Sequence, residues 1–296
     1  METQARAVYL GMDQATLDSA YNTRGAVPDH EVWGALRSDR SAQARATMHC
    51  ELDVRYGESG RQAVDIFPAG PDSPVEIYIH GGAWKLKAKD DVSFIAEPLV
   101  PAGVTYVAID HDPATLASLD EIVGQIRAGI AWIYRNITRY GGDPERLHVS
   151  GHSSGAHLAA MALATSWEAD FGLPADVIKG ACLTSGLYDL EPLRLGSRNE
   201  YLDLDEAAVA RLSPIHNVPA SAGSLLLSVG GRETPEFVRQ TTAYRSALEV
   251  AGHRTRFVDM PDDHHYSLAV RPGQADSALF QAVLADIKAL PRGGVQ

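Results

Sequence analysis

The stretch LHVSGHSSGAHL, residues 147–158, decides the fold of this chain. Its apolar start, Leu147–Ser150, predicts a buried strand, and the alanine-rich run from Ala156 onward predicts a helix. Between them stands Gly-x-Ser-x-Gly, a turn so sharp that side chains at either glycine position would collide with the strand or the helix. We therefore expect Ser153 to present an exposed hydroxyl on a strand-to-helix bend, in front of the N–H groups that begin the helix. The pentapeptide alone arises by chance in roughly one of ten chains of this length, so the flanking elements carry the interpretation.

On both sides of this bend, short apolar runs alternate with segments of helical period. The predicted strands are Val75–Ile79, Val104–Ile109, Leu147–Val149, Ile178–Leu183, Leu225–Val229 and Thr255–Asp259. The predicted helices are Ile122–Ile137, Ala156–Thr165, Phe237–Val250 and Asp276–Leu290. Before them, Leu52–Tyr56 and Ala63–Phe67 alternate in polarity and predict an antiparallel hairpin. The pattern predicts an α/β fold with a mostly parallel central sheet, an antiparallel start and helices on both faces.

Composition, net charge and cysteine content exclude several classes of protein. The chain has 296 residues, 45% hydrophobic and 22% charged, which predicts a single globular domain over 1–296. Its formal net charge of −12 argues against nucleic acid as a partner, and no apolar run approaches the ~18 residues of a membrane span. Cys50 and Cys182 are expected to be reduced thiols in a cytoplasmic protein. No metal-binding spacing of His and Cys occurs, and neither a metal nor another cofactor is expected.

Residues 1–50 precede the sheet and predict polar helices. We expect two helices around a break at Val27–Pro28, with Asp13 as the N-cap of the first. Such a segment is suited to cap the site or to form a homodimer interface, and the sequence leaves both roles open.

A glycine-rich loop, His80-Gly81-Gly82-Ala83-Trp84, follows the predicted strand that ends at Ile79. Attack on a carbonyl creates an oxyanion, which needs preorganised N–H donors, and glycines let the backbone approach it closely. Gly81 and Gly82, together with the amide of Ser154, are the expected oxyanion hole. We expect His80 to have a structural role.

The loops near the C-terminus supply a base and an acid in the chain order that the turn requires. Glu233 follows the strand that ends at Val229, and Glu236 is the alternative acid, although a carboxylate there suits the start of the next helix. His265 or its neighbour His264 is the base. The remaining histidines outside these loops, His30, His49, His148, His216 and His253, are expected at the surface or as caps.

Taken together, these motifs resemble α/β-hydrolases of the kynurenine formamidase (arylformamidase) and small carboxylesterase type, over about residues 21–268. The resemblance rests on HGGAW (80–84), GHSSGAHL (151–158), SGLYDL (185–190), LSP (212–214), PEF (235–237) and HYS (265–267). It implies that the nucleophile is Ser153 and that the base is His265, the histidine before an aromatic residue. It places the acid at Glu233, where the family usually has Asp, so that Asp262 and Asp263 remain stand-ins.

The resemblance implies a serine hydrolase that cleaves a small ester or an aryl formamide or other amide through an acyl-enzyme, with a triad of Ser153, His265 and Glu233. A general carboxylesterase for short acyl chains is the alternative, and a binding protein that kept the fold but lost turnover is the alternative of another class. Trp84 and Tyr266 are candidate walls of the substrate pocket, although each is equally suited to the packed core. Ser154 and His111 stand where the family commonly has Ala and Tyr, and both are expected to reshape the pocket.

Overall fold

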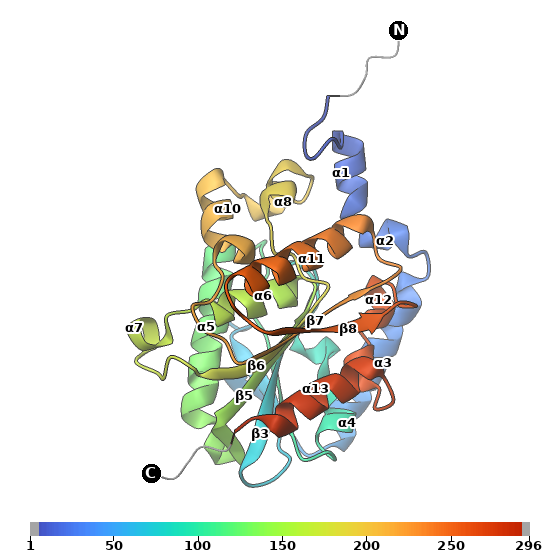
Figure 1. Cartoon of the computed structure of the whole chain (residues 1–296). Coiled ribbons are helices and arrows are strands. Elements are labelled where there is room, and N and C mark those ends of the chain that lie inside the picture. Colours follow the sequence, from blue (N-terminus) through green and yellow to red (C-terminus); the bar gives the residue numbers. More distant parts are fainter. Residues whose placement is uncertain (1–5, 292–296) are drawn as a thin grey trace.

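The computed structural model describes residues 6–291, and their centre is an eight-stranded sheet (Figure 1). The strands are β1 Glu51–Arg55, β2 Ala63–Phe67, β3 Ser73–Ile79, β4 Thr105–Ile109, β5 Gly142–His152, β6 Ile178–Thr184, β7 Ser224–Gly230 and β8 Thr255–Met260. Their spatial order is β1-β2-β4-β3-β5-β6-β7-β8. The β1–β2 and β2–β4 pairs are antiparallel, and every later pair is parallel. The predicted fold class is confirmed, and so is the hairpin at its start.

Helices cover both faces of this sheet (Figure 1). They are α1 Gln14–Ala20, α2 Thr23–Ala26, α3 His30–Thr47, α4 Ala96–Leu99, α5 Leu119–Asn136, α6 Ser154–Leu163, α7 Trp167–Phe171, α8 Glu191–Leu195, α9 Asn199–Leu202, α10 Glu206–Leu212, α11 Pro235–Val250, α12 His265–Leu268 and α13 Ala278–Ala289. Side chains of α5, α6 and α11 pack in one core against one face, and those of α4 and α13 pack in a second core against the other. No helix within residues 6–291 is long and apolar enough to cross a membrane.

The N-terminal segment has one more helix than predicted. The break at Val27–Pro28 lies between α2 and α3 as expected, and Asp13 caps α1 by accepting the N–H of Thr16 at 2.9 Å. A second break at Tyr21 and Asn22 separates α1 from α2, because the Asn22 side chain accepts the N–H of Gly25 and starts a new turn. This capping interaction depends on a local bond that the helical period does not reveal.

The sheet positions the functional loops. In parallel sheets the ligand lies beyond the carboxyl ends of the strands. Strands β3, β5, β7 and β8 end at Ile79, His152, Gly230 and Met260, and the loops with the glycine, serine, glutamate and histidine motifs follow directly. The topology thus gathers at one edge residues that lie as much as 185 positions apart, as His80 and His265 do.

Candidate active site

The bend between β5 and α6 holds Ser153 in a strained backbone conformation, with φ 57° and ψ −122°. A Cβ on Gly151 would lie 2.3 Å from the carbonyl oxygen of Gly155, and one on Gly155 would lie 2.1 Å from that of Ile79. Both contacts are impossible for a side chain, so the two glycines are what allow the bend. A non-glycine residue with positive φ costs of the order of 1–3 kcal/mol, and such strain gathers at functional sites.

Ser153, His265 and Glu233 form a continuous hydrogen-bonded chain. The Oγ atom of Ser153 lies 3.1 Å from Nε2 of His265, and Nδ1 of the same ring lies 2.6 Å from Oε2 of Glu233. Because a carboxylate only accepts, Nδ1 carries the proton that faces it, and Nε2 is left with the lone pair that faces the serine hydroxyl. The arrangement has the geometry of a nucleophile, a base and a residue that orients the base.

The side chain of Glu233 is fully buried and held from two further directions. Its Oε1 accepts the N–H of Gly230 at 3.0 Å and the hydroxyl of Ser185. These donors offset the cost of burying the charge. They also fix where the longer side chain ends, so the extra methylene relative to Asp is accommodated. Ser185 belongs to a motif that the sequence highlighted without assigning it this contact.

The rival acids and base have other partners. Glu236 binds the Tyr21 hydroxyl at 2.7 Å and the guanidinium of Arg239. The His264 ring accepts the N–H groups of Tyr266 and Ser267 and so caps α12. The stand-in carboxylates form ion pairs, Asp262 with Arg232 and Asp263 with Arg271.

The glycine-rich loop lies directly against the nucleophile. A Cβ on Gly81 would approach the carbonyl oxygen of His152 to 2.6 Å and Cβ of Ser153 to 3.3 Å. The carbonyl oxygen of Gly81 lies 2.9 Å from Nδ1 of His80 and so faces that ring. In a trans peptide the C=O and the following N–H point in opposite directions, so the N–H of Gly82 points away from His80. Gly82 has φ +127° and lines the cavity beside Ser153. The Ser154 amide belongs to the first turn of α6, where N–H groups have no partner within the helix.

Trp84 does not line the cavity and lies in the packed core, so of the two positions expected for it the pocket wall is the wrong one. Its side chain is buried, and its indole N–H donates to Nδ1 of His157 at 3.2 Å. The other ring nitrogen of His157 donates to the carbonyl of Leu212 at 2.8 Å. Tyr266 does line the cavity, with its hydroxyl 3.3 Å from that of Thr23.

His111 also lies outside the cavity wall. Its ring stacks on that of His80, with the centroids 4.6 Å apart, and burial lowers its pKa to about 3. Because its pKa is lowered, the His111 ring is neutral at pH 7, and it packs against His80, the first residue of the glycine-rich loop.

The expectation of a surface position for His148 is wrong as well. This histidine is fully buried on the central strand β5, where its Nδ1 lies 2.5 Å from Glu76 and its Nε2 lies 3.4 Å from Asp286. Burial by itself lowers the pKa of His148, but the nearby charges of Glu76 and Asp286 raise it to about 9. Glu76 on the neighbouring strand β3 and Asp286 on helix α13 create this environment, which the sequence does not reveal.

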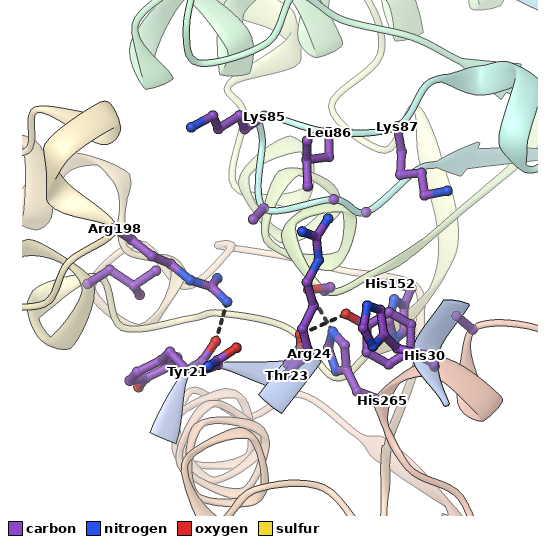
Figure 2. A pocket seen from close by; sticks show the side chains of 18 of the residues that line it. Tyr21, Thr23, Arg24, His30, Lys85, Leu86, Lys87, His152, Arg198 and His265 are labelled. Atoms are coloured by element: carbon purple, nitrogen blue, oxygen red, sulfur yellow. Dashed lines mark hydrogen bonds between the residues drawn. The ribbon is translucent and has the colours of Figure 1, made fainter. Parts of the chain in front are cut away.

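Ser153 and His265 line a cavity of about 790 Å³, which Figure 2 shows with His265 labelled. One wall is the glycine-rich loop, the serine bend and α12; the other is the N-terminal segment, including Tyr21, Thr23, Arg24 and His30. Arg198, just before α9, closes one side and donates to the Tyr21 carbonyl at 2.5 Å. Sequence reasoning missed four lining residues: Tyr21, Arg24 and Arg198, which lie outside the quoted motifs, and His152, which lies within the serine motif but received no role.

Two curated relatives decide the family. The kynurenine formamidase of Danio rerio is 35% identical over 242 residues, covering 79% of this chain and 80% of its own. That of Salmo salar is 34% identical over 251 residues, covering 82% and 83%. The chain belongs to the kynurenine formamidase family of α/β-hydrolases. This family member is thus a hydrolase acting on ester or amide bonds.

Other comparisons agree on the fold of this formamidase-family hydrolase. The BD-FAE family model matches residues 66–179. A putative thioesterase from Silicibacter sp. TM1040 superposes with a TM-score of 0.81 at 23% identity, covering 92% of this chain and 99% of that one. The esterase of Pyrobaculum calidifontis superposes with a TM-score of 0.73 at 19% identity, covering 92% and 96%. The predicted resemblance is confirmed.

Proposed function

We propose that this hydrolase cleaves aryl formamides and small esters by forming an acyl-enzyme on Ser153. The observation that supports the proposal is the hydrogen-bonded chain of Ser153, His265 and Glu233 at the wall of a cavity. The family relatives, which are named kynurenine formamidases, favour a formamide as substrate.

The first half of the reaction forms the acyl-enzyme. The Ser153 hydroxyl adds to the carbonyl carbon while its proton passes to Nε2 of His265. Glu233 holds the ring in the required tautomer and stabilises the imidazolium that results. The carbonyl oxygen becomes an anion, to which the amides of Gly81, Gly82 and Ser154 are the proposed donors. When the bond to the amine or alcohol breaks, imidazolium delivers its proton to that departing group.

The second half releases the acid. Water gives its proton to His265 and adds to the acyl carbon, and collapse of the second oxyanion breaks the bond to Ser153. The serine oxygen recovers the proton from the imidazolium, so the chain returns to its starting state. With a formamide, the products are formate and an amine.

A general esterase is the second candidate, because a cavity of about 790 Å³ has room for acyl groups much longer than formyl. Rates on formanilide and on the acetyl, butyryl and octanoyl esters of nitrophenol separate the two. We expect formanilide and the acetyl ester to be the best substrates. A clear preference for octanoyl would remove the formamide assignment and leave the esterase.

Labelling with a fluorophosphonate tests the nucleophile and the third alternative, a binding protein without turnover. We expect the wild type to be labelled and Ser153→Ala to be unlabelled, while Ser154→Ala, its neighbour on the same bend, keeps the label. A folded wild type that resists labelling would support the binding protein.

A further inference from the structure

The cavity contains more positive charge than the chain as a whole would suggest. Its lining includes five basic side chains, Arg24, Arg37, Lys85, Lys87 and Arg198, against two acidic ones, Asp18 and Glu31. The formal net charge of the chain is −12. Asp18 is already occupied, since its carboxylate accepts the N–H of Ser197 at 2.6 Å. A cleft lined by one sign of charge attracts ligands of the other sign.

Arg198 is one of two basic lining residues, with Arg37, that have a buried guanidinium nitrogen without a hydrogen-bond partner. One guanidinium nitrogen, Nη2, donates to the Tyr21 carbonyl, whereas Nη1 is buried and has no hydrogen-bond partner. The group lies 5.9 Å from the centre of the Tyr21 ring. Burial lowers the pKa of Arg198, and the groups that act against this shift are the phenols of Tyr201, Tyr21 and Tyr266, none of them a carboxylate.

Arginines elsewhere in the described chain show what is missing. Arg239 pairs with Glu236 at 2.8 Å, and Arg271 pairs with Asp263 at 2.7 Å. A partly buried guanidinium without such a partner loses hydration and receives no countercharge in return. The unpaired N–H groups of Arg198 therefore match a ligand oxygen that carries negative charge.

Arg24 approaches the same cavity from another element. It lies on α2, and its side chain points from that helix toward the loop at Leu86 (Figure 2). Tyr21, three residues earlier, supplies the carbonyl that holds Arg198. The N-terminal segment thus contributes one guanidinium and positions a second.

We propose that Arg198, with Arg24 at the same cavity, forms an anion-binding subsite that selects substrates carrying a carboxylate or a phosphate group. The proposal rests on the proposed function, because it assigns the charge of the molecule that Ser153 attacks. Arg198 is a specificity-determining residue that contacts the anion and takes no part in the proton transfers at His265.

Binding to the Ser153→Ala protein tests the subsite independently of turnover. We expect calorimetry to show benzoate or phenyl phosphate binding at least about 10-fold more tightly than neutral benzamide at low salt, the preference shrinking as salt is added. The tighter of the two anions identifies the group that the subsite takes. Equal affinity for benzamide and both anions would overturn the proposal.

Variants assign the effect to the residue. In the Ser153→Ala background, Arg198→Met should weaken binding of the anion about 10- to 100-fold and leave benzamide unchanged. Arg198→Lys, which keeps the charge without the planar fork, should recover part of the loss and covers the case in which the methionine variant does not fold. Arg24→Met should have a smaller effect in the same direction. Arg211→Met, which removes a surface arginine paired with Asp120, is the matched control and should bind like the parent.

The subsite and the proposed function fail in different ways. If the anion binds tightly and Arg198→Met abolishes the preference while the wild type hydrolyses neither formanilide nor esters, the function is wrong and the subsite stands. If neutral substrates are hydrolysed, but Arg198→Met either weakens binding of the anion and of benzamide equally or weakens neither, the subsite is wrong and the function stands.

Discussion

Two histidines of this hydrolase lie between a carboxylate and a second polar partner, yet the two places differ in almost everything else. His265, at the carboxyl edge of the sheet, lies between Glu233 and the hydroxyl of Ser153 and faces the cavity. His148, inside the sheet, lies between Glu76 and Asp286 and is closed off from solvent. A serine is near there too, since Oγ of Ser150 lies 3.5 Å from Nδ1 of His148.

The comparison shows that the same residue types, a histidine with a carboxylate and a nearby serine, do not by themselves form a site of proton transfer. Two carboxylates around one buried imidazole stabilise its charged form, and a ring that is already protonated at neutral pH cannot accept a further proton. One carboxylate and one hydroxyl leave Nε2 with a lone pair aimed at the group that must lose a proton. We therefore propose that His265 takes part in the chemistry and that His148 stabilises the fold, and four experiments test this division.

Removing each imidazole should have opposite consequences. We expect His265→Gln to lower kcat by about 10⁶-fold, as loss of a base does in serine hydrolases, while the protein stays folded. His148→Gln should keep kcat per folded molecule within a few-fold. Esterase rates, normalised to the folded fraction by circular dichroism, make the measurement. Comparable losses of kcat in both variants would abolish the distinction.

The acid beside His265 should matter less than the base but far more than its neighbours. Glu233→Gln keeps the shape and removes the charge, so we expect a loss of about 10⁴-fold in kcat. Asp262→Asn is the control, because its carboxylate is 82% exposed and paired only with Arg232. If the control variant loses more activity than Glu233→Gln, the acid has been assigned to the wrong loop.

Breaking the buried pair in the sheet should cost stability. Glu76→Gln leaves charged His148 without its closest carboxylate, so we expect the free energy of unfolding to fall by about 3–5 kcal/mol in urea titrations. The double variant Glu76→Leu with His148→Leu should recover much of this loss, because no buried charge is left unpaired. If Glu76→Gln is as stable as the wild type, the ion pair of Glu76 with His148 does not stabilise the fold.

Alkaline pH should weaken the fold through the same histidine. The folded-state pKa of His148 is about 9, above the unfolded value near 6.5, so its stabilisation is complete below about 6.5 and is lost as pH rises through 9. We expect the Tm to fall between pH 7 and 10, with about 2–4 °C for each kcal/mol lost. The Glu76→Leu, His148→Leu protein should show a flatter profile; parallel profiles would argue against this linkage.

Much of the fold, including the strands and the bend at Ser153, could be predicted from short stretches of consecutive residues. Gly151 is required by a clash with Gly155 within the bend itself, whereas Gly155 is required by a clash with Ile79 of the neighbouring strand β3. The apolar runs correctly predicted the buried strands. The chain order of Ser153, Glu233 and His265 predicted which side chains would meet the serine, because the loops that follow parallel strands lie at the same edge of the sheet. The extra break in the N-terminal helices escaped prediction, because it depends on one side-chain bond from Asn22.

What only the tertiary structure decided was the surroundings of each side chain. Nothing local distinguishes a Trp84 that faces a substrate from one that donates to His157, or a His148 at the surface from one locked between carboxylates. The same holds for Arg198, which lines the cavity and donates to the carbonyl of Tyr21, 177 positions earlier in the chain. Sequence determined the bends and strands by short-range sterics, whereas charge and exposure depend on neighbours that only the folded chain brings within a few ångströms.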